Sequence, residues 1–138
     1  MDQVQAERIR TVFAKIHGPA FDADTELSTG IEVDVIDAGI ALDTPTFILL
    51  TPWTINGLAF PPDRNFPVAL EIDGATQSVY SIERSNLGPY RAVTLAALGS
   101  HFPSPMHARH FAERAAPKFR RAVEEARTFL AMAGASGE

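Results

Sequence analysis

The chain of 138 residues contains no cysteine. This absence excludes disulfide bonds, thiolate metal sites and cysteine nucleophiles, and it fits a protein of a reducing compartment. The chain also lacks a surplus of positive charge, because 12 Lys and Arg residues stand against 17 Asp and Glu residues. A nucleic-acid-binding domain usually carries a basic patch or stripe. The composition therefore argues against a nucleic-acid partner.

Long apolar segments are missing too. The longest apolar run lies around residues 47–50, far short of the roughly 20 residues that a transmembrane helix needs. The first 17 residues interleave charged and apolar side chains, unlike a signal peptide. A hydrophobic content of 46% and a charged content of 21% are ordinary for a globular protein. We therefore expect one soluble, cytoplasmic domain over residues 1–138, with residues 134–138 frayed.

Helical periodicity appears at both ends of the chain. Apolar residues recur at helical spacing from Ile9 to Ile16, and Gly18-Pro19 then predicts the end of this first helix. Near the other end, Pro105 suits the first position of a helix that carries an apolar stripe from Phe119 to Leu130. Pro117 predicts a break or kink near residues 115–116, because proline removes a helical hydrogen bond.

The middle of the chain predicts β-structure. Alternation over residues 31–35 indicates a half-buried strand with Glu32 and Asp34 facing water. Asp73-Gly74 predicts a hairpin, because both residues tolerate the positive φ of tight turns. The expected strands cover residues 31–35, 40–42 (a weak one, after a turn at 37–39), 46–51, 66–72, 77–83 and 90–98. The fold class is α+β, with an N-terminal helix, a mostly antiparallel sheet of four to six strands, and C-terminal helices packed on the sheet.

Motifs of catalysis and cofactor binding are not found. The sequence has no Gly-rich phosphate loop, dinucleotide fingerprint, nucleophile elbow or zinc-protease helix motif. We therefore expect no catalytic residues, no cofactor and no enzyme activity. His101, His107 and His110 offer one alternative, because His107 and His110 share a helix face and Glu113 lies three residues further on. These side chains are either a metal site or surface polar residues. The alternative function is a small-ligand or metal-binding domain that uses this histidine cluster or a pocket under Trp53.

Two segments combine aromatic residues with rigid turns. Residues 51–62 join the single tryptophan, Trp53, to Pro52, an Asn-Gly pair and a double proline. Residues 87–90 place Tyr90 directly after a Gly-Pro turn. Tryptophan and tyrosine anchor protein interfaces because they bury much area with few rotatable bonds. The alternative is that Trp53 and Tyr90 fill the core at strand ends.

The same segments resemble a known family, the nickel–iron hydrogenase assembly chaperones of the HybE/HupJ type. The resemblance covers residues 9–130 and identifies the chain as a divergent member, since residues 93–103 are longer than the family pattern and contain no cysteine. The matching pieces are residues 47–53 (Phe-Ile-Leu-Leu-Thr-Pro-Trp), 56–58 (Asn-Gly-Leu), 60–61 (Phe-Pro), 87–90 (Leu-Gly-Pro-Tyr), 94–95 (Thr-Leu) and 104–106 (Ser-Pro-Met), after a leading helix with Arg10-Thr11-Val12-Phe13 and Ile16-His17.

The resemblance implies a chaperone that holds a hydrogenase precursor subunit before its export through the twin-arginine pathway. Net acidity favours encounter with a basic leader peptide. The oligomeric state and the identity of the client subunit stay open. The residues that we expect to bind the partner are Thr51, Pro52, Trp53, Asn56, Gly57, Leu58, Leu87, Gly88, Pro89, Tyr90 and Met106.

Overall fold

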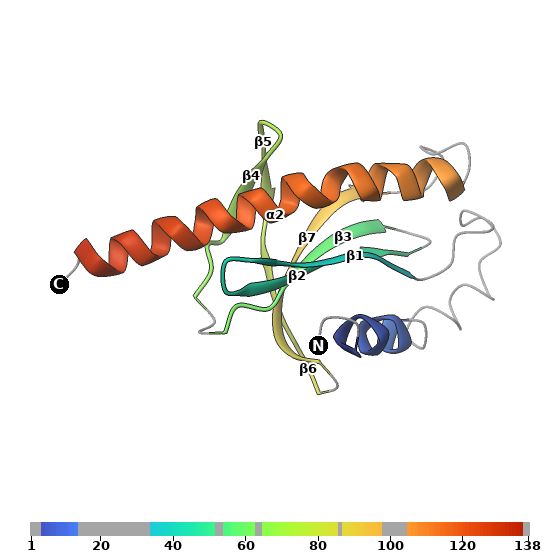
Figure 1. Cartoon of the computed structure of the whole chain (residues 1–138), viewed down its shortest axis with the longest axis horizontal. Helices are drawn as coiled ribbons and strands as arrows, with labels where there is room; N and C mark the ends of the chain where they lie inside the picture. Colours follow the sequence, from blue (N-terminus) through green and yellow to red (C-terminus); the bar gives the residue numbers. More distant parts are fainter. Residues whose placement is uncertain are drawn as a thin grey trace.

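A five-stranded antiparallel sheet lies between two helices of unequal length (Figure 1). The computed structural model describes residues 4–13, 34–51, 54–62, 65–85, 87–97 and 105–136. Residues 4–13 form the N-terminal helix, and α2 runs over Pro105–Ser136. The strand order in the sheet is β1-β2-β3-β7-β6. The strands are β1 (Asp34–Ala41), β2 (Thr44–Leu50), β3 (Thr54–Ala59), β4 (Ala69–Ile72), β5 (Ala75–Ser78), β6 (Tyr80–Arg84) and β7 (Gly88–Ala97).

The hairpin expected at Asp73-Gly74 is confirmed. Asp73 has a φ of 54° and Gly74 a φ of 83°, the positive values that a two-residue hairpin turn needs. The turn joins β4 to β5, which form a separate two-stranded sheet. The strand expected over residues 77–83 is divided, because β5 pairs with β4 whereas β6 pairs with β7 in the main sheet. The fold class is α+β as expected, with five strands in one sheet and two in the other.

One face of the sheet packs against α2. Phe119 and Val123 of the helix are buried in a cluster with Ile48, Ile55 and Val93 of the strands. The helix contributes mostly small side chains to the rest of this contact, among them Ala108, Ala112, Ala116 and Ala122. Small residues let the helix axis come close to the strands.

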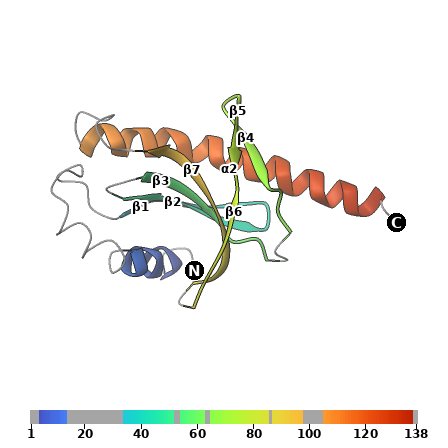
Figure 2. The same cartoon turned by 180° about the vertical axis from the view of Figure 1, so that it is seen from behind.

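The opposite face packs against the N-terminal helix (Figures 1 and 2). Ile9 is fully buried and Phe13 nearly so. They join a cluster of mainly large side chains from β2, β3 and β7. Both helices therefore contribute to the core, and the sheet is the middle layer of three.

Two strands differ from the expected boundaries. β1 is continuous over Asp34–Ala41, with a register shift between Val35 and Asp37, so the turn expected at residues 37–39 is wrong. The chain turns instead at residues 42 and 43, where Leu42 has a φ of 59°. Residues 54–59, which belong to the segment 51–62 interpreted as rigid turns and to none of the expected strands, form β3, the central strand, which pairs with both β2 and β7.

The break expected near residues 115–116 is wrong, since α2 is one helix with Pro117 inside it. Pro117 and Glu113, four residues before it, are both exposed. The carbonyl that loses its helical donor therefore lies on the solvent side, where water can replace the donor. Buried residues on both sides of the proline, Ala116 and Phe119 among them, belong to one cluster with the sheet, and this packing outweighs the proline cost of about 3 kcal/mol.

The C-terminal part of α2 reaches beyond the sheet (Figure 1) and continues through Gly134 to Ser136, past the residue where the sequence predicts fraying. In the described ranges, neither helix combines the length and the apolar character that crossing a membrane requires.

Candidate protein-binding surface

The β2–β3 turn carries the most specific of the sequence motifs. Thr51 and Thr54 close it with reciprocal hydrogen bonds: Thr51 N–H donates to the Thr54 carbonyl at 2.9 Å, and Thr54 N–H donates to Thr51 Oγ1 at 2.9 Å. Thr51 is 1% exposed, so its role is to fix the turn. Pro52 and Trp53 follow Thr51 and lie outside the described residues.

Asn56, in β3, is hydrogen-bonded to the same turn. Its side-chain amide donates to Thr54 Oγ1 at 3.0 Å, and the side chain is half-buried. Asn56 pairs with Thr94 of β7, which is exposed. Thr54, Asn56 and Thr94 therefore line one end of a sheet face, and the N-terminal helix covers another part of the same face.

Gly57 faces α2, and its place is explained by packing. A β-carbon at this position would lie 2.6 Å from Cε1 of the Phe119 ring. No real side chain makes so short a contact, so the absence of a side chain is what lets the ring lie on β3. Gly57 is buried and presents no atom beyond its backbone to a partner.

Leu58 and Tyr90 lie beneath the N-terminal helix. Leu58 is 1% exposed and Tyr90 is fully buried. The Tyr90 ring packs against Phe60 with centroids 5.3 Å apart, and Phe60 meets Phe47 edge to face at 5.6 Å. Arg84 satisfies the tyrosine hydroxyl by donating from Nε at 2.9 Å. Of the two interpretations of Tyr90, the structure therefore supports the one in which it fills the core.

Leu87 lies in the β6–β7 turn, and Gly88 and Pro89 begin β7, at the other end of this strand from Thr94. Leu87 N–H donates to the Arg84 carbonyl at 3.0 Å, and Gly88 has a φ of 77°. Leu87, Gly88 and Pro89 are all half-buried. Because an extended strand rises about 3.3 Å per residue, the two motif segments are on the order of 20–30 Å apart and form no single patch.

Met106 in the first turn of α2 is 65% exposed. It lies at the same end of the sheet as the β2–β3 turn, because nearby Arg109 binds Asp34, the residue that pairs with Leu50 at the end of β2. Met106, Asn56 and Thr51 are thus members of the expected set that the structure brings to one end.

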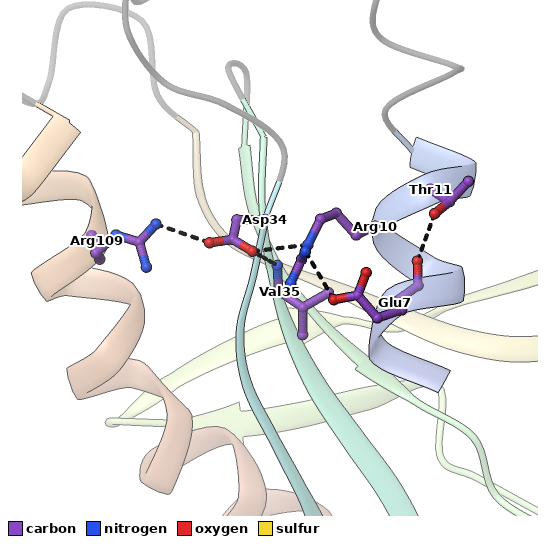
Figure 3. A network of polar contacts seen from close by, with 6 residues as sticks. All are labelled: Glu7, Arg10, Thr11, Asp34, Val35 and Arg109. Carbon is purple, nitrogen blue, oxygen red and sulfur yellow. Dashed lines mark hydrogen bonds and ion pairs between the residues drawn. The ribbon is translucent and has the colours of Figure 1, made fainter. Parts of the chain in front are cut away.

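Asp34 fixes this end by linking three elements (Figure 3). Its Oδ2 accepts a hydrogen bond from Arg109 of α2 at 2.9 Å, and its Oδ1 lies 3.1 Å from Nε of Arg10 in the N-terminal helix. The side chain is 27% exposed. The expectation that Asp34 faces water is therefore wrong, because two arginines from distant parts of the sequence hold it.

A second ion pair, with a buried arginine and an exposed carboxylate, fixes the opposite end of the sheet. Arg127 is 7% exposed and donates to both carboxylate oxygens of Asp43 in the β1–β2 turn, at 2.8 and 3.1 Å. It also donates to the Asn65 carbonyl at 2.5 Å. The hydrogen bonds from Arg127 hold the pKa of the Asp43 carboxyl below its ordinary value of 3.8. This pair joins α2 to two loops and has a structural role.

The histidine alternative gains no support from the described residues. His107 and His110 are both exposed on α2, and His101 lies outside the described part of the chain. Among the residues that the structure places, no three of the metal-ligating types gather as a metal site requires.

An open groove of about 480 Å³, which was not predicted from the sequence, lies between the β4–β5 hairpin, β7 and α2. Its apolar part comes from Ile72, Leu95, Phe111 and Ala115, and Arg114 and Lys118 stand at its edge. The spacing of 111, 114, 115 and 118 along α2 is that of one helix face. This spacing is visible in the sequence, but the hairpin that makes the opposite wall is not.

Comparison with known proteins gives a likeness in fold. No protein-family model matches the sequence, and no curated protein matches it. Among solved structures, the chain is similar to the solution structure of HybE from Escherichia coli, with a TM-score of 0.58 and 18% sequence identity. The match covers 88% of this chain and 77% of the HybE chain.

Proposed function

We propose that this protein is a non-enzymatic assembly chaperone of nickel–iron hydrogenase maturation, which binds a precursor subunit or its leader peptide. The observation that carries the proposal is the agreement of a likeness in sequence motifs with a likeness in fold. The sequence segments at residues 47–61 and 87–90 resemble the HybE/HupJ chaperones, and the fold over most of the chain is similar to that of HybE. At 18% identity the fold likeness does not come from a close sequence relationship.

The contact surface that we propose is the end of the sheet at the β2–β3 turn. Its exposed and half-buried members are Met106 and Asn56, and Trp53, which lies outside the described residues, follows the turn residue Thr51 in the sequence. An exposed methionine adapts to different apolar partners because its side chain is flexible. Leu58 and Tyr90 support this surface from the core and contact no partner directly.

The double ion pair of Asp34 serves the same surface. It joins the N-terminal helix, β1 and α2 through Arg10 and Arg109, next to the β2–β3 turn. A surface held by contacts between three elements loses little conformational entropy on binding, and this favours affinity. The chain's net charge of −5 adds long-range attraction for a basic leader peptide, which raises the rate of encounter.

A matched pair of methionine variants tests the surface. Met106 and Met132 lie near opposite ends of α2 and are 65% and 64% exposed. We expect Met106→Asp to weaken binding of a purified hydrogenase precursor about tenfold, since it places a charge in an apolar contact, and Met132→Asp to leave binding within twofold. Isothermal titration calorimetry gives both dissociation constants, and circular dichroism confirms the fold. Equal effects of the two substitutions refute the proposed surface.

Trp53 provides a second readout. It is the single tryptophan of the chain, so its emission reports on one position. We expect a blue shift of this emission and reduced quenching by acrylamide when a tryptophan-free leader peptide of the precursor is added. An unchanged spectrum at saturating peptide removes Trp53 from the contact surface.

A further inference from the structure

Arg114 differs from the other arginines of α2 in its lack of a carboxylate partner among the described residues. Arg109, Arg120, Arg121 and Arg127 each have a carboxylate partner: Asp34, Asp37, Glu125 and Asp43 in turn. Arg114 is exposed and forms no ion pair or hydrogen bond with any residue that the structure describes. It is also the arginine of this helix that borders the groove between α2, β7 and the β4–β5 hairpin. An unpaired guanidinium beside a groove is an attractive site for an anion.

The other residues of the groove indicate which groups the bound anion carries beside its charge. Ile72 and Ala115 are 9% and 8% exposed, and Leu95 and Phe111 are half-buried, so the floor is apolar. Gln77 and Asp73 are the polar groups of the hairpin wall. A ligand that matches both parts carries apolar groups next to a carboxylate.

Lys118 adds a second cation one helical turn from Arg114, on the same face of α2. Its Nζ lies 3.0 Å from Oδ2 of Asp73 in the hairpin turn, so this ion pair bridges the two walls of the groove. Both side chains are more than half exposed, at 51% and 71%. An ion pair so exposed contributes little stability, and Lys118 can exchange Asp73 for another carboxylate at little cost.

The length of the groove favours the end of a chain over its middle. From Phe111 to Lys118 the helix rises about 10 Å, which matches about three extended residues. The Lys118–Asp73 bridge lies at one end of this length. Along this length Arg114 lies about 5 Å and Lys118 about 10 Å from Phe111, so a polypeptide that enters from the Phe111 end passes both cations within about three residues, where its own terminal carboxylate satisfies them.

We propose that this groove binds the C-terminal residues of a partner protein, with apolar side chains on the floor and the terminal carboxylate at Arg114 and Lys118. The inference rests on the proposed function for the kind of partner, a protein. It adds a second binding site, on the α2 face of the sheet, and states the chemistry of the ligand that this site selects. The terminal carboxylate supplies two oxygens, one for each cation.

Three short peptides and NMR spectroscopy of the full chain test this. The probes are acetyl-Ala-Leu-Phe with a free carboxylate, the same peptide as a C-terminal amide, and acetyl-Leu-Glu-Phe amide, which has an internal carboxylate. We expect the free carboxylate at millimolar concentration to shift the amide signals of Leu95, Phe111, Arg114 and Ala115. Affinity for either amide should be about two- to tenfold weaker, as for the loss of one or both exposed ionic contacts.

Matched variants assign the effect to the groove. Arg114→Ala should remove the preference for the free carboxylate, whereas Arg121→Ala, which deletes an equal charge from α2 outside the groove, should retain it. Ala75→Leu should fill the groove and block binding, whereas Thr76→Leu on the other face of β5 should leave binding unchanged. Ala75 and Thr76 are both exposed, so neither substitution disturbs the core.

The outcomes separate this inference from the proposed function. Absence of groove shifts at 10 mM peptide (on the order of the weakest binding expected for a three-residue probe), or equal binding of acid and amide, overturns the inference. Equal binding of the internal carboxylate overturns the preference for a chain end. If the wild-type chain still binds hydrogenase precursor in these cases, the proposed function stands. If the acid peptide binds as expected but no precursor does, the proposed function fails and the groove remains a site for chain ends.

Discussion

On one face of the central sheet α2 packs mainly through alanines, with Phe119 and Val123 among them, whereas on the other face residues 4–13 pack through large side chains. The α2 face is closed by alanines, by Gly57 beneath the Phe119 ring, and by ion pairs that run from the helix to β1 and its turn. The other face is closed by Ile9 and Phe13 over a cluster that includes Phe47 and Tyr90.

The difference bears on where function can lie. The close α2 contact has no room for extra atoms, so motif residues there, such as Gly57, are explained by packing. The short N-terminal helix covers only part of its face and leaves Asn56 and Thr94 accessible beyond it. The proposed partner surface lies where this shorter cover ends.

The largest effect expected is on the side of the N-terminal helix. Ile9→Ala removes a fully buried side chain and should lower the free energy of unfolding by about 3 kcal/mol, within the range for such truncations. Val4→Ala in the same helix, at a residue 65% exposed, should change it by less than about 0.5 kcal/mol. Urea denaturation measures both. Similar values for the two variants mean that this helix is not a structural layer.

A smaller effect is expected from an added β-carbon on the α2 side. Gly57→Ala forces the buried Phe119 ring to move and should cost about 2 kcal/mol. At Gly39 a β-carbon would lie 2.7 Å from Nε of Arg120, whose flexible side chain can shift, so Gly39→Ala should cost less than about 1 kcal/mol. The same denaturation experiment compares them. The reverse order contradicts the close approach of α2 at β3.

Local sequence preferences misassign several residues whose place depends on distant parts of the chain. Asn56-Gly57 looks like a turn because of its local preferences, yet long-range pairing with β2 and β7 makes it strand. In the same way, Asp37 and Asp34 look like turn and surface residues until Arg120 and Arg109, far along the sequence, are placed beside them.

Features that depend only on neighbouring residues agree with the prediction from sequence. The Asp73-Gly74 turn was predicted correctly because its positive φ values depend on those two residues alone. The start of α2 at Pro105 also agrees with the prediction, since proline suits the first helical position. Continuation through Pro117 was not predictable, because it depends on packing of Ala116 and Phe119 against a sheet formed by other parts of the chain.

The candidate site was predictable only in part. The sequence identified the aromatic and turn segments, but it did not separate residues that face outward, such as Met106, from buried ones, such as Tyr90. The groove beside Arg114 was missed because one wall is a hairpin some forty residues earlier in the chain.

The smallest effect concerns the ion pair between Asp43 and Arg127. Asp43→Asn should lower the free energy of unfolding at neutral pH by about 1 kcal/mol or less, because the carboxylate is 55% exposed and solvent screens the pair. The pKa of Asp43 is lower in the folded than in the unfolded protein, so the pair stabilises the fold above the unfolded value of 3.8. That stabilisation is lost as the pH falls through the folded value.

The pH dependence provides the control for this prediction. The difference in unfolding free energy between wild type and Asp43→Asn should be constant from pH 7 to about pH 5 and should shrink below pH 3.8. Urea denaturation at a series of pH values measures it. A difference that grows on acidification contradicts the assignment of Arg127 as the cause of the pKa shift.

The central claim, that this protein binds a hydrogenase precursor, is tested most directly by affinity capture of the tagged full chain from its native cells, with mass spectrometry of the captured proteins. The Met106→Asp chain, expressed at the same level, is the matched control. We expect hydrogenase subunits that still carry their leader peptides to be enriched with the wild-type chain and depleted with the variant. Failure to enrich any hydrogenase subunit from cells shown to contain the precursors would contradict the account.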